Sequence, residues 1–268
     1  MRLAGKVAIV TGGGSGIGRA LARGVGSEAA SGVVVADLDG AAAEAVADEI
    51  GGSALGVACD VTSEADLRSL IERTEKAFGP VDAFFANAGV AAGADEQTPE
   101  DVWDRALSVN VRSHVLAARL LVPGWLERGG GLFVSTASAA GLLTQIGVAP
   151  YAVSKHAALA FAEWLSVTYG DRGVQVACVC PMGVDTRMMR PEASGGMAAA
   201  AVESVRSSGA LLAPEDVAEA VVRGIAEERF LILPHPEVLE YFRRKASDYD
   251  RWLAGMRRLR RAVESAGP

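Results

Sequence analysis

Short apolar runs alternate with stretches of helical pattern along most of the chain, and this alternation limits the fold more than any other feature. The runs are nearly continuous in Val, Ile, Ala and Phe, which is typical of strands covered by helices on both faces. Strands separated by helices need crossover connections and therefore lie parallel in one sheet. The expected strands are Val7–Thr11, Val33–Asp37, Ala54–Ala58, Ala83–Ala86, Leu132–Thr136, Val174–Val179 and Phe230–Leu233. The sequence therefore predicts an α/β fold with a doubly wound parallel sheet of about seven strands flanked by helices.

Helical patterns fill the intervals between these strands. They are expected at Gly16–Ser27, Ala41–Ile50, Ser63–Phe78, Pro99–Glu127, Pro150–Tyr169 and Pro214–Glu227. No linker rich in Pro, Gly or Ser divides the chain, so we expect a single domain over residues 1–234. Residues 186–213 interrupt the alternation, and their Ala, Gly, Ser and Met content predicts a mobile loop with a short helix. Residues 235–268 are expected to form a C-terminal helical extension.

Composition and charge argue against several classes of protein. The net charge of −7 speaks against nucleic-acid binding, which requires an excess of Lys and Arg. The three cysteines, Cys59, Cys178 and Cys180, are too sparse for a disulfide framework and indicate a reducing cytoplasm. The three histidines are scattered, so we expect no metal site. We expect neither a signal peptide nor a membrane span, since no apolar run approaches ~18 residues.

A glycine-rich loop follows the first expected strand directly. It reads Gly12–Gly13–Gly14–Ser15–Gly16–Ile17–Gly18 and leads into the first helix. Glycines let the backbone turn sharply and approach a pyrophosphate, and the amides at the start of the helix attract its negative charge. Such a loop alone is a weak signal, because flexible turns and methyltransferases also carry it. Its position between a buried strand and a helix favours a dinucleotide site.

The end of the second strand indicates which dinucleotide is bound. Asp37 stands there, nineteen residues after Gly18. An acidic residue at this distance accepts hydrogen bonds from the ribose hydroxyls of adenosine and repels a 2′-phosphate. No Lys or Arg lies within the glycine loop or directly after Asp37 to neutralise that phosphate. The sequence therefore favours NAD over NADP.

A tyrosine and a lysine share one helix face in the middle of the chain. Tyr151 and Lys155 are four residues apart, and Ser138 lies thirteen residues before the tyrosine, after a strand. An ammonium group beside a phenol favours the phenolate, so we expect Lys155 to lower the pKa of Tyr151 from its usual value near ~10. Tyr151 is then a candidate general acid and base. A Tyr–Lys pair by itself is common on helix surfaces. The nearby Ser138 supports the assignment of Tyr151 as a catalytic group.

Taken together, these motifs resemble the short-chain dehydrogenase/reductase family over residues 1 to about 234. The matching residues are Thr11–Gly12, Gly16 and Gly18 of the TGxxxGxG loop, Asp60–Val61 of the adenine-contacting pair, Asn87–Ala88–Gly89 of the NAG motif, the active-site asparagine Asn110, and Ser138 with Tyr151 and Lys155 of the YxxxK motif. The resemblance implies a Rossmann-type fold, NAD(H) as cofactor, and hydride transfer between the nicotinamide and a carbon bearing a hydroxyl or carbonyl group.

The resemblance also implies a set of residue roles. Tyr151 exchanges the proton, Ser138 stabilises the substrate oxygen, Lys155 binds the nicotinamide ribose, and Asn110 positions a water. The implied cofactor-binding residues are Gly12, Ser15, Gly16, Ile17, Gly18, Asp37, Asp60, Val61, Asn87, Ala88, Gly89, Tyr151, Lys155, Pro181, Val184 and Thr186. One residue departs from the pattern, because Met182 stands where the family usually has glycine. We expect Met182 to shape the substrate pocket.

The substrate pocket is expected to be mostly apolar. Its implied contacts are Ser138, Gln145, Tyr151, Met182 and Met188, with 186–213 acting as a lid. Such walls favour an apolar secondary alcohol or ketone. The alternatives are an acyl-thioester ketoreductase of the fatty-acid type, against which Asp37 and the acidic composition speak, and a non-catalytic NAD-binding regulator. Family members commonly pair through two helices, here Ser108–Glu127 and Tyr151–Tyr169, so we expect a homodimer or homotetramer.

The C-terminal extension has an amphipathic pattern. Its apolar residues are Phe242, Tyr249, Trp252, Met256, Leu259 and Val263, with Lys245 interrupting the row, and arginines lie on the other side. This spacing predicts one long helix over Pro236–Val263 with a stripe along one face. A basic amphipathic helix can also bind a membrane surface. We expect docking onto its own subunit or the partner near the lid, because the aromatic residues are spread along the stripe.

Overall fold

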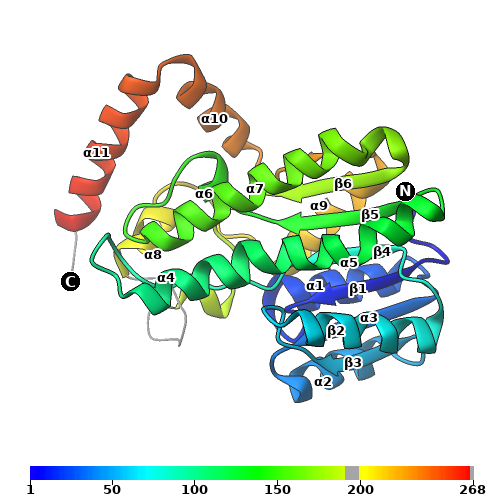
Figure 1. The fold of residues 1–268 in the computed structure, drawn as a ribbon. Helices are drawn as coiled ribbons and strands as arrows, with labels where there is room; N and C mark the ends of the chain where they lie inside the picture. The colour runs from blue at the N-terminus through cyan, green and yellow to red at the C-terminus, as the bar shows by residue number, and fades with distance from the viewer. Residues whose placement is uncertain (191–198, 266–268) are drawn as a thin grey trace.

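Seven strands form one sheet in the computed structural model, which describes residues 1–190 and 199–265 (Figure 1). The strand order is β3-β2-β1-β4-β5-β6-β7, and every neighbouring pair is parallel. The strands are β1 (Val7–Thr11), β2 (Gly32–Asp37), β3 (Ala54–Ala58), β4 (Ala83–Ala86), β5 (Gly131–Thr136), β6 (Val174–Val179) and β7 (Leu231–Ile232). The doubly wound parallel sheet predicted from the apolar runs is confirmed.

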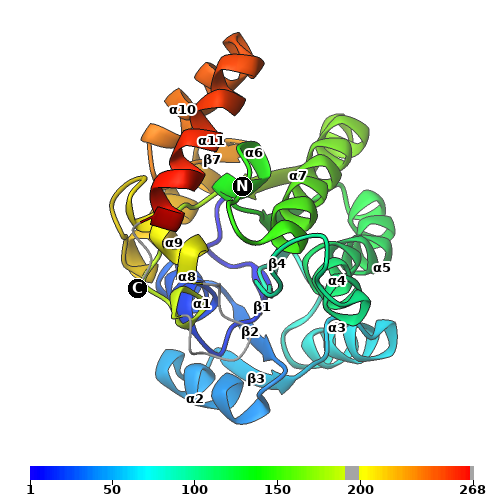
Figure 2. The same cartoon turned by 90° about the vertical axis from the view of Figure 1, so that its left-hand side faces the viewer.

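Helices cover both faces of this sheet (Figure 2). The helices are α1 (Gly16–Ser27), α2 (Gly40–Ile50), α3 (Glu64–Phe78), α4 (Glu100–Leu107), α5 (Ser113–Glu127), α6 (Ala139–Leu142), α7 (Ala149–Tyr169), α8 (Ala199–Arg206), α9 (Pro214–Ala226), α10 (Glu237–Ser247) and α11 (Tyr249–Ser265). One buried cluster joins the sheet to α3, α5 and α7, and a second joins it to α1, α2 and α9. None of the helices in the described part of the chain is long and apolar enough to cross a membrane.

Alternation along each strand explains the two clusters. Ile9 of β1 packs with the cluster of α3, α5 and α7, whereas Ala8 and Val10 pack with that of α1, α2 and α9. Successive side chains of a strand point to opposite faces, and both faces are buried here. Strand β1 is buried at every position. A strand of this kind has no polar face, which is why the apolar runs in the sequence are continuous.

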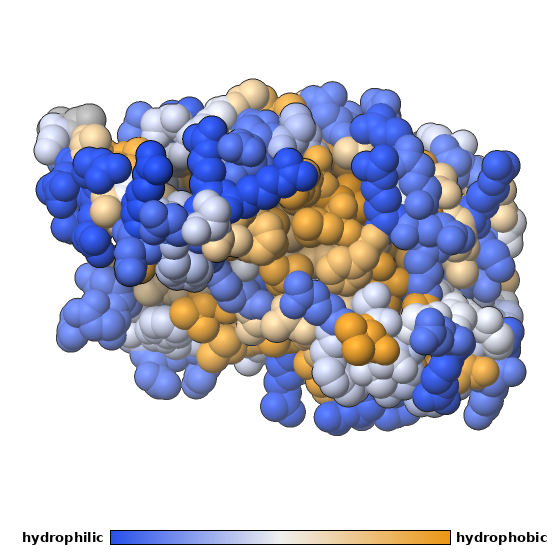
Figure 3. All heavy atoms as spheres, turned by 90° about the horizontal axis from the view of Figure 1, so that it is seen from above, coloured by the Kyte–Doolittle hydropathy of each residue, from blue (hydrophilic) through white to orange (hydrophobic). Residues whose placement is uncertain are grey.

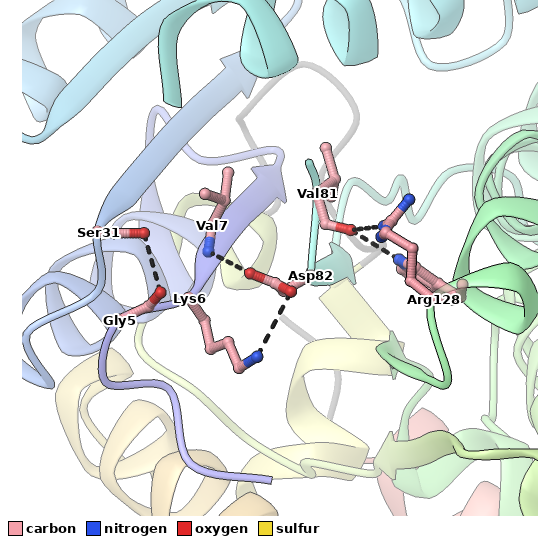
Figure 4. Close-up of polar contacts among 8 residues, drawn as sticks. Gly5, Lys6, Val7, Ser31, Val81, Asp82 and Arg128 are labelled. Carbon is pink, nitrogen blue, oxygen red and sulfur yellow. Dashed lines mark hydrogen bonds and ion pairs between the residues drawn. The ribbon is translucent and has the colours of Figure 1, made fainter. Parts of the chain in front are cut away.

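Polar contacts tie the amino ends of the central strands together (Figure 4). The carboxylate of Asp82 accepts a hydrogen bond of 3.0 Å from the backbone N–H of Val7 and lies 3.5 Å from the Lys6 ammonium. The carbonyl of Val81 accepts hydrogen bonds from Trp125 at 2.7 Å and from Arg128 at 2.9 Å. These contacts hold the amino ends of β1 and β4 in register, so the opposite edge of the sheet is available for a site.

The long helix expected over Pro236–Val263 is wrong in one respect, because the structure divides it into α10 and α11. Asp248 adopts an extended conformation between them, with φ −154° and ψ 91°. Its carboxylate accepts a hydrogen bond of 2.9 Å from the backbone N–H of Arg251 and so caps the start of α11. Aspartate is strongly preferred at this capping position, and its extended conformation ends the preceding helix. The apolar stripe therefore continues on a second helix with a new direction.

Candidate active site

A cavity of about 780 Å³ opens at the carboxyl ends of the strands. The strand order reverses between β1 and β4, and a doubly wound sheet forms its ligand crevice at this point. Loops after β1, β2, β3, β4, β5 and β6 all contribute walls. Every predicted site residue except Asn110 lines this cavity: Gly12, Ser15, Gly16, Ile17, Gly18, Asp37, Asp60, Val61, Asn87, Ala88, Gly89, Ser138, Gln145, Tyr151, Lys155, Pro181, Met182, Val184, Thr186 and Met188.

Hydrogen bonds at the ends of β1 and β4 hold the glycine loop in place. The hydroxyl of Thr11 accepts hydrogen bonds from the backbone N–H groups of Asn87 at 3.0 Å and Ala88 at 3.2 Å. The Asn87 side chain in turn donates to the carbonyl of Thr11 at 3.0 Å. A Cβ on Gly12 would lie 2.8 Å from the Cα of Ala88, and one on Gly18 would lie 1.9 Å from the carbonyl oxygen of Gly12. Only glycine fits at these two positions.

This loop fits the pyrophosphate of a dinucleotide. The close approach of Gly12 and Gly18 brings the N-terminal end of α1 to the wall of the cavity, where its amide groups favour negative charge. At the far edge, Asp37 accepts hydrogen bonds from the N–H of Gly14 at 2.9 Å and of Asp39 at 3.1 Å. These bonds fix a carboxylate beside the loop, as binding of a ribose with free hydroxyls requires.

The basic residue that follows the loop is already paired. Arg19 forms a two-point contact with Glu49, with N–O distances of 2.8 and 3.1 Å. This bidentate pair engages the guanidinium with a carboxylate of α2. Leu38, which the sequence analysis did not single out, lies at the same edge of the cavity and is 72% exposed. No motif signals this residue, because its position depends only on following Asp37.

Ser138, Tyr151 and Lys155 come together at the centre of the cavity. Ser138 follows β5 and caps α6, accepting a hydrogen bond of 3.1 Å from the N–H of Ala140. Tyr151 and Lys155 both project from α7, and the ammonium lies 5.7 Å from the centre of the phenol ring. All three side chains are buried. A hydroxyl, a phenol and an ammonium are thus placed in a water-poor pocket beside the glycine loop.

The pKa expected for Tyr151 differs from the one that the structure supports. Burial raises the pKa of Tyr151, and the hydrogen bond with Ser138 opposes this effect. Lys155 donates its hydrogen bond to the carbonyl of Thr136, at 2.8 Å, and burial lowers the pKa of Lys155 to about 8. The pKa of Tyr151 in the protein alone is therefore above its usual value and not below it, because burial disfavours the charged phenolate.

Asn110 lies behind the cavity wall and does not line it. It sits in a π-helical turn, Ser108–Arg112, between α4 and α5. Its amide oxygen accepts a hydrogen bond from the N–H of Val90, and its amide nitrogen donates to the carbonyl of Val90 and the hydroxyl of Ser154, each at 2.9 Å. These contacts secure the segment after Gly89 and the helix turn that carries Lys155. The side chain thus supports the site from outside.

Met182 is accommodated with the help of a histidine from the other end of the chain. The backbone N–H of Met182 donates to Nδ1 of His235 at 3.1 Å. Nε2 of the same ring donates to the carbonyls of Gly183 at 3.0 Å and Ala210 at 3.2 Å. His235 is buried, and its two ring nitrogens satisfy all three backbone groups. The histidine fixes the backbone on which Met182 projects into the cavity.

We expect His235→Phe to lower the free energy of unfolding by about 1–3 kcal/mol, because the variant keeps the ring but leaves the buried N–H of Met182 without an acceptor. Urea denaturation measures the change. His156→Phe is the matched control, since the His156 ring hydrogen-bonds the carbonyl of Ala152 within its own helix. Equal losses in the two variants would show that the His235 contacts contribute nothing.

At the substrate end of the cavity, the side chain of Gln145 is hydrogen-bonded within the protein. Its amide nitrogen donates to the hydroxyl of Ser204 at 2.8 Å and to the carbonyl of Ala201 at 3.3 Å, both in α8. The side chain therefore connects α8 to the loop after α6, and its amide N–H groups are used within the protein. Residues 191–198 of the predicted lid lie outside the described residues. Met182 and Met188 line the cavity as expected.

The C-terminal extension supplies cavity residues that the sequence analysis missed. They are Tyr241, Arg244, Trp252, Met256 and Leu259. Helix α11 packs against α8 of the same chain, which lies within the segment predicted to form a lid. The apolar stripe of the extension indicated that one face of the helix is buried. The stripe does not indicate which part of the protein covers that face.

A family model and two sequence relatives match most of this chain. The model of the short chain dehydrogenase family matches residues 6–196, well over half of the chain. The 2-(S)-hydroxypropyl-CoM dehydrogenase 3 of Xanthobacter autotrophicus is 35% identical over 82% of this chain and 89% of its own. The mitochondrial (−)-isopiperitenol/(−)-carveol dehydrogenase of Mentha piperita is 35% identical over 87% of this chain and 91% of its own.

Two solved structures are similar in fold and sequence. A short chain dehydrogenase/reductase from Burkholderia phymatum in complex with NAD has a TM-score of 0.83 and 33% identity, over 93% of this chain and 96% of that one. A 3-ketoacyl-(acyl-carrier-protein) reductase from Brucella melitensis complexed with NADH has a TM-score of 0.76 and 32% identity, over 87% and 95%. The chain therefore belongs to the short-chain dehydrogenase family and is an NAD-dependent oxidoreductase.

Proposed function

We propose that the protein interconverts a secondary alcohol and a ketone on an apolar small molecule, with Tyr151 as the proton-transfer group. The observation that carries this proposal is the placement of Ser138, Tyr151 and Lys155 in one cavity with the glycine loop. When bound, the nicotinamide supplies or accepts the hydride. Tyr151 takes the alcohol proton during oxidation and returns it during reduction. Ser138 hydrogen-bonds the substrate oxygen and stabilises the charge that develops there.

The remaining cavity residues bind and orient the cofactor in this proposal. Lys155 binds the nicotinamide ribose, and the α1 amides with the glycine loop bind the pyrophosphate. Asp37 accepts hydrogen bonds from the adenosine ribose. Asn110 acts through its neighbours, by fixing the backbone beside Gly89. The rest of the cofactor wall comprises Ser15, Ile17, Asp60, Val61, Asn87, Ala88, Pro181, Val184 and Thr186.

An apolar substrate is supported by the walls around the reacting centre. Met182, Met188, Met189 and Val205 line the cavity. The last two belong to a buried cluster that also contains Tyr151. Val202 and Val205 of α8 cover this side of the cavity, which supports a lid over residues 186–213. Apolar walls of this kind favour hydrocarbon over sugar or phosphate groups, because a polar group would lose its hydration there.

A panel of alcohols and ketones tests the proposal. Reduction of apolar ketones by NADH, with little turnover of an acetoacetyl thioester, is the expected result. A preference for the thioester would favour the alternative of an acyl-thioester ketoreductase. The Brucella reductase was crystallised with NADH, so the cofactor alone does not separate the two activities. Binding of NADH without turnover of any alcohol, ketone or thioester would favour a non-catalytic regulator.

We expect the kcat/KM with NAD to exceed that with NADP by at least about tenfold, which corresponds to ~1.4 kcal/mol. The reason is repulsion between the fixed carboxylate of Asp37 and a 2′-phosphate. Asp37→Ser should lower the ratio of kcat/KM with NAD to kcat/KM with NADP. Asp39→Ser is the matched control, because Asp39 caps α2 through its side chain and serine keeps that contact. Steady-state kinetics with both cofactors measure the ratio, and equal efficiencies in the unmodified protein would contradict the assignment.

We propose a homodimer or homotetramer with two-fold symmetry, with α5 and α7 at the interface. Both helices lie on one face of the sheet (Figure 2). Helix α7 exposes Val153, Trp164 and Val167, the last of which is 87% exposed. Large apolar side chains gathered on one helix are typical of a surface that pairs with another copy.

Light scattering at micromolar concentration is expected to give at least the mass of a dimer. Val167→Glu should shift the protein toward the monomer, because a charge buried at an interface loses its hydration. Ala45→Glu places the same charge on α2, away from this face, and should leave the mass unchanged. A monomeric parent protein would rule out the assembly.

We place the protein in the cytoplasm. Cys59, Cys178 and Cys180 are all free and buried. Three unpaired thiols are typical of a reducing compartment, where disulfides do not persist.

A further inference from the structure

The C-terminal extension contains a buried lysine whose contacts join two parts of the active-site cavity. Lys245 lies in the last turn of α10 and is only 6% exposed. Its ammonium donates hydrogen bonds to the carbonyls of Leu142 at 2.8 Å and Leu143 at 2.9 Å. It also lies 4.9 Å from the ring centre of Trp252 and 5.4 Å from that of Tyr249. The charge is therefore satisfied by carbonyl oxygens and aromatic faces.

One side of this contact is the segment that carries Ser138. Ser138 caps the start of helix α6, which ends at Leu142, so the ammonium meets the carbonyl end of this short helix. Positive charge is favoured at that end, where the backbone carbonyls have no partner within the helix. Leu143 and Gln145, directly after α6, line the cavity. Lys245 thus touches the turn between the Ser138 hydroxyl and the wall of the substrate region.

The other side of the contact is the outer wall of the cavity. Trp252, Met256 and Leu259 of α11 line the cavity at alternating steps of four and three residues, and Val263 further along the same face is buried. This spacing places them on one side of the helix. The arginines of α10 and α11 are exposed, and Figure 3 shows hydrophilic surface beside an apolar area in the middle of the upper face.

A second contact connects the extension to the end of the lid. The hydroxyl of Tyr241 in α10 donates to the carbonyl of Ser208, at 3.0 Å. Ser207 and Ser208 follow α8 and line the cavity. The bend at Asp248 then directs α11 back over α8. The extension is therefore held at two places around the substrate end of the cavity, by Tyr241 and by Lys245. Of these two contacts, the one made by Lys245 is buried and charged.

We propose that Lys245 positions the C-terminal extension so that Trp252, Met256 and Leu259 select the apolar part of the substrate remote from its carbonyl group. This inference rests on the proposed ketone reduction. The substrate class it assigns is a ketone with a bulky hydrocarbon group, because the three side chains offer apolar surface and no hydrogen-bond acceptor. Without the Lys245 contact, α11 leaves the cavity, and small ketones lose far less binding energy than bulky ones.

The test compares four variants on two ketones, butanone and 4-tert-butylcyclohexanone. Lys245→Met keeps the length of the side chain and removes its charge, and Trp252→Ala removes part of the wall without touching the anchor. Both should lower the ratio of kcat/KM for the bulky ketone over the small one by about tenfold, through KM. Lys245→Arg should restore much of the ratio, because a guanidinium also donates to carbonyls and stacks on aromatic rings. Arg243→Met, an exposed position on the same helix, is the charge-matched control.

Hydrogen exchange measured by mass spectrometry provides a readout that does not depend on activity. Lys245→Met should increase exchange in residues 249–265 and also in residues 139–148, whereas Arg243→Met should change neither. If Lys245→Met matches Arg243→Met in exchange and in the ketone ratio, the inference is wrong. An equal loss for both ketones would also overturn it, since Lys245 would then act on Ser138 alone. If the unmodified protein reduces no ketone, the proposed function fails, and the exchange result by itself decides whether Lys245 anchors the extension.

Discussion

Tyr151→Phe is expected to lower turnover by about 10³-fold or more while NADH still binds. The substitution removes only the phenolic hydroxyl, and general acid and base catalysis contributes on the order of 10²–10⁴ to a rate. The buried ring keeps its packing against α8, so the fold and the cofactor cleft are retained. Stopped-flow or steady-state rates give the turnover, and a fluorescence titration gives NADH affinity. Tyr169→Phe, the same change at the end of the same helix, is the control and should retain normal turnover.

The pH dependence of the unmodified protein adds a second check on this assignment. Burial raises the pKa of Tyr151, so the phenol is protonated at neutral pH. Oxidation of an alcohol needs the phenolate, and its rate should rise as the pH increases into the alkaline range. Reduction of a ketone needs the phenol and should slow over the same range. Near-normal turnover by Tyr151→Phe, or rates of both directions that do not change with pH, would show that another group moves the proton.

Ser138→Ala is expected to lower turnover by on the order of 10²–10³, as for other donors to a developing oxyanion. The loss should lie mainly in kcat, because the hydrogen bond strengthens as charge forms on the substrate oxygen. Serine at this position also caps α6 and hydrogen-bonds Tyr151, so its removal should raise the pKa of Tyr151 further. The pH profile of alcohol oxidation should therefore shift to higher pH in the variant.

The control for this prediction lies in the same cavity. Ser207 lines the cavity, but its hydroxyl bonds to the carbonyl of Ser204 in the preceding turn. Ser207→Ala should have a much smaller effect on kcat. If the two alanine variants have the same kcat and the same pH profile, Ser138 has no role at the reacting oxygen.

Local physical rules were enough to predict the sheet and the glycine loop. A strand buried on both faces must be apolar throughout, and β1 and β5 are buried at every position. Gly12 has a φ of +64°, and a side chain there would meet Ala88. These requirements restrict single residues or short runs, so they can be recognised directly in the sequence. For the same reason the predicted site residues, apart from Asn110, all meet in one cavity.

Properties that depend on distant neighbours could not be predicted in this way. The expected effect of Lys155 on Tyr151 came from helix spacing, whereas the raised pKa results from burial by segments far along the chain. Asn110 was expected to position a water, and in the structure its amide group hydrogen-bonds with Val90 and Ser154. For Tyr151 and Asn110 the residue type identified a candidate site residue, whereas the surrounding structure determined its pKa or its hydrogen-bond partners.

The sequence by itself determined the parallel sheet and the dinucleotide loop, because each follows from backbone sterics or from burial of a short run. Ser138, Tyr151 and Lys155 were identified from helix spacing and from the motifs of a known family. Only the tertiary structure decided how the C-terminal extension is used. In the sequence, Lys245 interrupts an apolar row, yet in the structure it is buried against the carbonyls of Leu142 and Leu143. A charged side chain is buried only where distant groups satisfy it, and those groups come from a segment about a hundred residues earlier in the chain.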